Sequence, residues 1–111
     1  MEQDTRIPVL FGLQPDTNDM VLLEEGLAAP AAGRARRFTT AMPGHLPGCS
    51  CCVARSPAAT ALAAVFRARA MGTAPYFSRL LVQATPAGRL DIEVALAQDA
   101  LCRARFRLSE A

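Results

Sequence analysis

Four side chains that can bind metal ions lie close together between residues 45 and 52. Three of them are cysteines, Cys49, Cys51 and Cys52, and the only histidine of the chain, His45, lies four positions before the first. Thiolate and imidazole are the groups that zinc and similar transition metals prefer as ligands. Cysteine in a folded domain is usually a scattered small hydrophobic residue. The cluster therefore indicates metal ligation, thiol redox chemistry, or a loop whose cysteines bind nothing.

The cluster contains a complete zinc ligand set. A structural zinc site takes four nitrogen or sulfur ligands, and His45, Cys49, Cys51 and Cys52 supply four within a loop rich in glycine and proline. Adjacent side chains tend to diverge, so one of the two neighbouring cysteines is expected to point into the core. That would leave an open coordination position or a site shared across a dimer. Zinc, or another divalent transition metal, is the predicted cofactor.

The same residues make a poor catalytic centre. A nucleophilic Cys49 or Cys51 would need a base, and the chain has one imidazole to offer. No carboxylate lies at a recognisable spacing to orient it. We therefore predict no catalytic residues and no enzymatic activity, with weak thiol redox behaviour as the open alternative. The fourth cysteine, Cys102, is expected in the core or on a helix face.

Composition predicts one folded domain spanning residues 1–111. The chain is long enough for a hydrophobic core, and 51% of its residues are hydrophobic. Its net charge of +2 is too small to indicate a nucleic acid or membrane partner. The start is polar and unlike a signal peptide, and no apolar run reaches the about 20 residues of a membrane span. We expect a cytoplasmic protein with reduced thiols.

The pattern of apolar and turn-forming residues predicts the elements that carry the cysteine loop. Three runs are predicted strands: residues 6–13, 37–42 and 77–84. Asp19 is placed to cap a short helix through residues 20–27. The clearest helix begins at Ser56 and Pro57, since serine caps free amides and proline suits the first helical position, and it ends at Gly72.

The last quarter of the chain carries two competing patterns. Apolar residues alternate with polar ones along 90–94 and 102–108, as in the strands of an antiparallel meander. Four apolar residues also fall at helical spacing: Leu90, Val94, Ala97 and Leu101. A helix over residues 88–104 predicts an α/β domain, whereas strands predict an α+β domain with a meander over residues 76–108.

The segment from Gly48 to Leu108 resembles the CobW-like GTPases, a family of nucleotide-dependent metallochaperones. Its Gly48, Cys49, Cys51 and Cys52 match the family's Gly-Cys-x-Cys-Cys loop. Further on, Phe77 and Arg79 match the start of the family's next strand, and residues 99–108 match its Asp-Pro…Ala-Arg-Phe-Arg-Leu ending. The resemblance implies a reduced P-loop-GTPase-like core: a small, mostly parallel sheet of three strands, with residues 57–71 as a crossover helix.

The chain departs from this family where the family binds nucleotide. The phosphate loop Gly-x-x-x-x-Gly-Lys-Ser/Thr corresponds here to residues 12–19, which include Pro15, Asp16 and Asp19, and the chain has no lysine: all 12 of its basic residues are arginine. The family's Glu-Thr-Thr-Gly is here residues 83–86, Gln-Ala-Thr-Pro. The guanine-reading Asn-Lys-x-Asp is absent. We therefore expect no nucleotide binding and no GTP hydrolysis.

Two functions follow from these observations. The first is a metal-binding accessory protein related to the CobW-like metallochaperones, which works without GTP turnover. The alternative is a non-catalytic pseudo-GTPase that binds another protein and whose cysteine loop is vestigial. A three-stranded sheet would leave an edge and apolar residues such as Phe11 and Phe38 uncovered. We therefore expect a homodimer or a complex with a protein partner.

Overall fold

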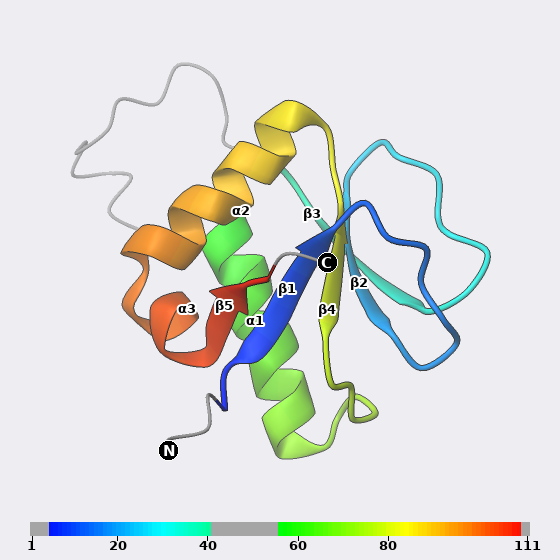
Figure 1. Ribbon diagram of the computed structural model, residues 1–111, viewed down its shortest axis with the longest axis horizontal. Coiled ribbons are helices and arrows are strands. Elements are labelled where there is room, and N and C mark those ends of the chain that lie inside the picture. The colour runs from blue at the N-terminus through cyan, green and yellow to red at the C-terminus, as the bar shows by residue number, and fades with distance from the viewer. Residues whose placement is uncertain (1–4, 41–55, 110–111) are drawn as a thin grey trace.

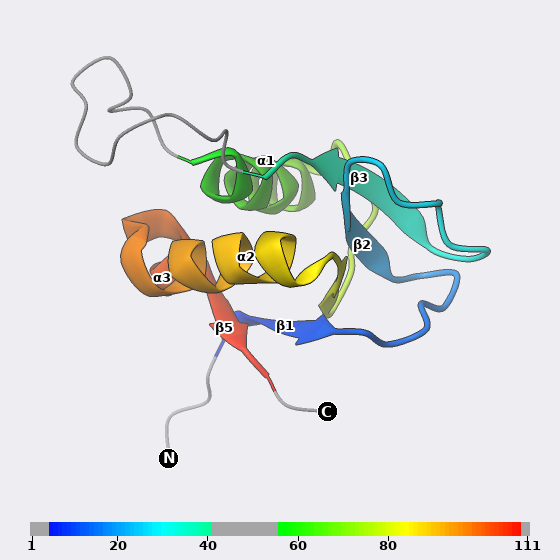
Figure 2. The same cartoon turned by 90° about the horizontal axis from the view of Figure 1, so that it is seen from above.

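The computed structural model describes residues 5–40 and 56–109, which form an α/β fold around a parallel sheet. The described strands are β1 (Ile7–Phe11), β2 (Met20–Glu24), β3 (Arg34–Phe38), β4 (Leu80–Gln83) and β5 (Phe106–Leu108). They lie in the order β3-β2-β4-β1-β5, and every pair is parallel. The described helices are α1 (Pro57–Met71), α2 (Pro86–Gln98) and α3 (Ala100–Arg105). Figures 1 and 2 show these helices together on one face of the sheet.

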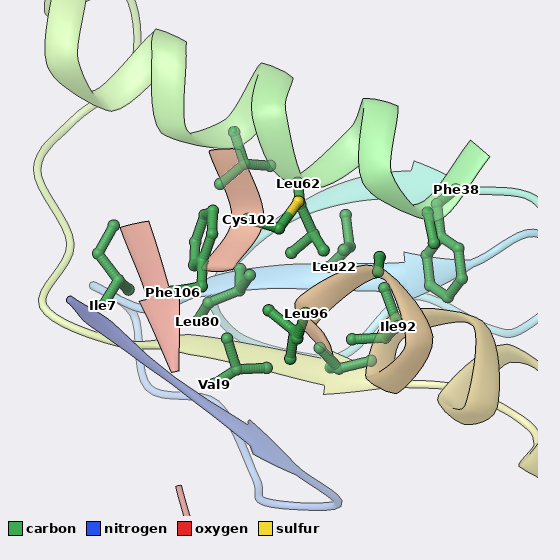
Figure 3. Close-up of a cluster of buried hydrophobic side chains, with 14 of the residues drawn as sticks. Ile7, Val9, Leu22, Phe38, Leu62, Leu80, Ile92, Leu96, Cys102 and Phe106 are labelled. Atoms are coloured by element: carbon green, nitrogen blue, oxygen red, sulfur yellow. The ribbon is translucent and has the colours of Figure 1, made fainter. Parts of the chain in front are cut away.

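The main core lies between the sheet and the helices. Alternate strand residues such as Val9, Leu22 and Leu80 point into it, and all three are fully buried. Leu62 of α1 and Ile92 of α2 meet them from the helix side (Figure 3). Burying a side chain of this size stabilises a fold by about 1.5–3 kcal/mol. This layer therefore holds the helices on the sheet.

The opposite face of the sheet is buried without a helix from the described part of the chain. Leu10, Val21, Leu23 and Leu81 form a second buried cluster there. Leu13 and Leu27, from the segments that follow β1 and β2, pack against it. Because both faces are covered, the central strands are continuous apolar runs, as is typical of parallel sheets.

The predicted helix beginning at Ser56 and Pro57 is confirmed as α1. The Ser56 hydroxyl accepts a hydrogen bond from the Ala59 amide at 3.1 Å, and Pro57 occupies the first turn. Gly72 ends the helix with a φ of 74°, a left-handed conformation that glycine adopts without strain. The helix connects β3 to β4, as a crossover between parallel strands should.

The predicted helix through residues 20–27 is wrong, because residues 20–24 form β2. This strand lies between β3 and β4 and is buried on both faces, so its apolar run needs no helical periodicity. Asp19 does not cap a helix. Its Oδ2 instead accepts the Asp16 amide at 2.7 Å, which closes the turn before β2. The strand predicted over 37–42 begins earlier, and β3 spans Arg34–Phe38.

Residues 88–104 are almost entirely helical, and the predicted antiparallel meander over residues 76–108 is wrong. The Thr85 hydroxyl caps α2 by accepting the Gly88 amide at 3.3 Å, with Pro86 in the first turn. Asp99 caps α3 by accepting the Cys102 amide at 3.1 Å. Only the last three residues of the alternating segment form a strand, β5, which pairs with β1.

The sheet is more complete than the three strands predicted, since β2 and β5 extend it. The expectation that Phe11 and Phe38 lie uncovered is also wrong. Phe38 is 3% exposed and belongs to the core between sheet and helices. Phe11 is half-buried at the end of β1 beneath a side chain of α2. None of the helices in the described residues is long and apolar enough to cross a membrane.

An ion pair joins the amino ends of β2 and β4. The Arg79 guanidinium donates from Nε to Asp19 Oδ1 at 2.9 Å and from Nη2 to Asp19 Oδ2 at 2.8 Å. Asp16 lies near the same guanidinium, at 3.7 Å. The hydrogen bond from Arg79 is the main reason that the pKa of Asp19 lies below its ordinary value, although burial opposes the shift. The pair fixes two segments that are 60 residues apart in the chain.

We expect Asp19→Asn to lower the free energy of unfolding by about 2 kcal/mol near neutral pH, because Arg79 loses a charged partner. A lowered pKa stabilises the folded state above the unfolded-state pKa of about 3.9, and this stabilisation is lost as the pH falls through the folded-state value. Urea unfolding of wild type and variant should therefore converge in acid. Asp16→Asn, at an exposed side chain, is the matched control and should change little. A difference in unfolding free energy between wild type and Asp19→Asn that stays constant across this pH range would contradict a charged Asp19 as the stabilising partner of Arg79.

Candidate functional site

The carboxyl ends of the parallel strands form the edge at which α/β proteins usually bind ligands. Ligands lie where connections leave adjacent strands toward opposite faces of the sheet. Here this point lies between β1 and β4. The chain after β1 packs Leu13 onto the helix-free face, whereas the chain after β4 enters α2 on the helix face.

A pocket of about 410 Å³ opens at this point, between the ends of β1 and β4 and the start of α2. Its walls combine apolar side chains with two amides and one guanidinium. The lining residues are Phe11, Gly12, Leu13, Gln14, Leu27, Val82, Gln83, Ala84 and Arg89. The pocket is lined by one positive charge, from Arg89, and by no carboxylate.

Arg89 is held in place by two contacts. Its guanidinium carbon lies 4.4 Å from the centroid of the Phe11 ring, a cation–π geometry. Its Nε lies 3.9 Å from Glu93 Oε1, one turn along α2. The side chain is 54% exposed, so solvent weakens both interactions. The charge that the pocket offers to a ligand is therefore partly neutralised by the helix itself.

The start of α2 is occupied by a carboxylate from the chain itself. Glu24, the last residue of β2, is 9% exposed. Its Oε1 accepts the Thr85 amide at 3.0 Å and the Thr85 hydroxyl at 2.8 Å. Helix N-termini attract anions because their first amides are free and the helix dipole is positive there. Glu24 takes the place that an anionic ligand would use.

Gly88 makes this arrangement sterically possible. A Cβ atom at Gly88 would overlap Glu24 Oε1 and would lie 3.1 Å from Ala84 Cβ. The absence of a side chain in the first turn of α2 therefore lets the Glu24 carboxylate reach Thr85. Gly88 itself is buried.

The turn after β1 is not built as a phosphate cradle. The Gly12 amide is directed at the sheet, where it donates to the Val82 carbonyl at 3.3 Å. Asp16 and Asp19, which correspond to phosphate-loop positions in the family resemblance, do not lie at this turn. Both lie at the amino end of β2, on the opposite edge of the sheet, where Arg79 pairs with them. Glu24 supplies the carboxylate at the carboxyl edge instead.

The predicted metal ligands His45, Cys49, Cys51 and Cys52 lie outside the described residues. Both ends of their segment belong to the carboxyl edge: β3 ends at Phe38, and α1 begins at Pro57. These two ends line one pocket of about 480 Å³, together with Thr60 and Ala61 of α1. The described residues contain no group of three potential metal ligands.

Cys102 lies in the core, as predicted. It is fully buried, and its Sγ lies 3.9 Å from the Ala59 carbonyl oxygen of α1. The sequence analysis missed Glu24 and Arg89. Glu24 was hidden by the helix predicted over residues 20–27. A buried run that ends in an acid, followed later by a Thr-Pro-x-Gly helix start, is the pattern that would have indicated it.

We expect GTP, ATP and inorganic phosphate to show no saturable binding to the protein and to leave its melting temperature unchanged. The α2 N-terminus already holds Glu24, Gly12 donates its amide to the sheet, and the chain has no lysine. Isothermal titration calorimetry with magnesium present would test this. As a control, Glu24→Gln removes the negative charge at the start of α2 but keeps a side chain of nearly the same shape, with an oxygen that can still accept hydrogen bonds. Micromolar affinity of the wild type for GTP would contradict the interpretation.

The carboxyl edge thus brings together a small pocket, an internally neutralised helix start and the two ends of the segment that carries the cysteines. Comparison of this chain with protein-family models, with curated proteins and with solved structures finds no match.

Proposed function

We propose that this protein is a metal-binding accessory protein that holds zinc, or a similar divalent ion, on its cysteine loop without hydrolysing GTP. One observation carries the proposal: β3 ends at Phe38 and α1 begins at Pro57, so the described chain on both sides of the cysteine loop lies at the carboxyl edge of the sheet, where α/β proteins usually bind ligands. Loops on a rigid scaffold commonly carry the functional groups of a protein. The donor set of this loop, three thiols and one imidazole, fits a zinc site.

The closed helix start supports the second half of the proposal. A nucleotide-driven metallochaperone needs a phosphate site whose occupancy changes the protein. Here Glu24 satisfies the amide and hydroxyl of Thr85, which leaves little positive potential for a phosphate. Metal uptake and release would then depend on the thiols alone. Each thiol must lose its proton to bind, so protons and metal compete for Cys49, Cys51 and Cys52.

We expect the purified protein, freed of metal by a chelator, to bind one zinc ion per cysteine loop and to release protons as it does so. Binding should weaken below about pH 6, where protons compete for the thiolates. The double variant Cys49→Ser/Cys51→Ser should lose most of the affinity, and His45→Ala should lose less if water can replace the imidazole. Competition with a chromophoric chelator would measure all of these.

Cys102→Ala is the matched control for the zinc experiment, since this cysteine is buried in the core and far from the loop in sequence. It should bind zinc as the wild type does. Wild-type protein that binds no more zinc than the double serine variant would show that the loop is vestigial.

The second candidate function, a non-catalytic module that binds another protein, is favoured by the composition of β3. Within the described residues this strand pairs with β2 alone, so its outer edge has unpaired backbone groups. Arg34, Arg36 and Arg37 are exposed along it. Arginine on an edge discourages uncontrolled pairing between sheets. The same charges would favour an extended acidic segment that adds to the sheet as a further strand.

We expect a metal-free peptide of alternating glutamate and valine to bind this edge if the second function operates. Its affinity should fall with added salt and should drop about tenfold in Arg34→Glu/Arg36→Glu, because like charges then oppose each other. Arg103→Glu, an exposed site on α3, is the control. Fluorescence anisotropy would measure binding, and equal affinities for wild type and the double variant would exclude this edge.

A further inference from the structure

The pocket between the ends of β1 and β4 contains hydrogen-bonding groups that the fold does not use. Arg89, Gln14 and Gln83 line it. The Arg89 guanidinium lies over the Phe11 ring, and its Nε is 3.9 Å from Glu93 Oε1, which is longer than a hydrogen bond. In the described part of the chain, no hydrogen bond joins this guanidinium, or the side-chain amide of either glutamine, to another residue. These polar groups are therefore available to a ligand.

The apolar walls of the pocket come from both layers of the fold. Phe11 and Ala84 pack against the core beneath the helices, whereas Leu13 and Leu27 cover the helix-free face. Val82, at the end of β4, lies between them. A volume of about 410 Å³ is near the lower end of ligand sites, which measure about 300–1,000 Å³. The pocket therefore suits a small molecule with a short apolar chain.

The single positive charge selects the kind of anion. A guanidinium matches a carboxylate through two parallel N–H···O bonds, and this pair balances one negative charge. A phosphate group carries about −1.5 to −2 at neutral pH. The further positive potential that it would need, at the start of α2, is already used by Glu24. No carboxylate lines the pocket to repel an anion, so a ligand with one carboxylate fits it better than a phosphate.

We propose that this pocket binds a small monocarboxylate that carries a second hydrogen-bonding group and a short apolar chain, as a hydroxy acid does. Arg89 binds the carboxylate, and Gln14 and Gln83 bind the second polar group. Leu13 and Leu27 contact the chain. The proposal does not depend on metal binding, since it uses none of residues 41–55.

Titration of isotope-labelled protein with α-hydroxyisocaproate, followed by amide NMR shifts, would test the proposal. Chelator and reductant keep metal and disulfides out of the measurement. The shifts should saturate with a dissociation constant of about 1 mM, as befits so small a ligand, and should be largest at Gly12, Gln83 and Arg89. The uncharged amide of this acid, and glycolate, which lacks the apolar chain, should each bind about tenfold more weakly.

Arg89→Met should weaken binding of the acid about tenfold and leave binding of its amide unchanged, because it removes the charge but keeps an unbranched chain. Gln14→Ala, at an exposed position, should weaken both ligands. Arg105→Met is the matched control: Arg105 is also exposed and also lies over an aromatic ring, that of Phe66 at 5.2 Å, but it does not line the pocket. This variant should bind as the wild type does.

Three results would overturn the proposal: shifts that do not saturate at tens of millimolar acid, equal affinity for the acid and its amide, or an Arg89→Met variant that binds the acid as the wild type does. The amide spectrum of each variant shows whether it is folded. Should Arg89→Met not fold, the comparison of the acid with its amide on the wild type still decides whether the charge is recognised.

Discussion

Two carboxylates, one at each end of β2, tie this strand to a segment about sixty residues further along the chain. Asp19 directly precedes β2 and Glu24 is its last residue. Their partners, Arg79 and Thr85, lie before and after β4. The paired strands are therefore joined by a polar contact at each end as well as by their backbone ladder. Parallel pairing of distant segments requires costly loop closure. Directional contacts at both ends fix the register, which apolar packing in a sheet buried on both faces would specify less strictly.

The contact between Glu24 and Thr85, at the carboxyl end of β2, also bears on anion binding at this edge. Because Glu24 completes the α2 N-terminus, structural stability and anion binding compete for the same amide and hydroxyl. A phosphate would have to displace a carboxylate that is already nearly buried. The pocket beside it retains one guanidinium, which is stacked on Phe11 and paired with Glu93. The described residues of this edge therefore offer an anion one partly neutralised positive charge.

Local rules predicted the elements that local interactions determine. Ser56, Pro57 and Gly72 define α1 through capping and backbone preference, and these act within one turn of helix. Residues 20–24 were misassigned because a strand buried on both faces has no period to detect. Its identity depends on neighbours far along the chain, β3 and β4. The parallel α/β class was predictable, since a crossover helix between apolar runs allows few alternatives, but the five-strand order was not.

Of the candidate site, the sequence indicated only the cysteine loop, which lies outside the described residues and stays a prediction. Ligand types and spacing are visible in a sequence, whereas the meeting of Glu24, Thr85 and Gly88 is a tertiary event. Thr85 and Pro86 were aligned with the end of the family's Glu-Thr-Thr-Gly motif, not with the start of a helix. Their role as the start of α2 appears once the helical alternative for residues 88–104 is chosen. The reason for a glycine at position 88 becomes clear only when the Glu24 carboxylate packed against it is known.

The uneven covering of the sheet gives its two faces different protection from water. On one face three helices must move before the core is exposed, whereas on the other Leu10, Val21, Leu23 and Leu81 are shielded by loop segments through Leu13 and Leu27. Loops open at a lower free energy than packed helices. Local opening is therefore expected first on the loop-covered face. It would expose this face of β1, β2 and β4 to water while the helices stay packed on the other face.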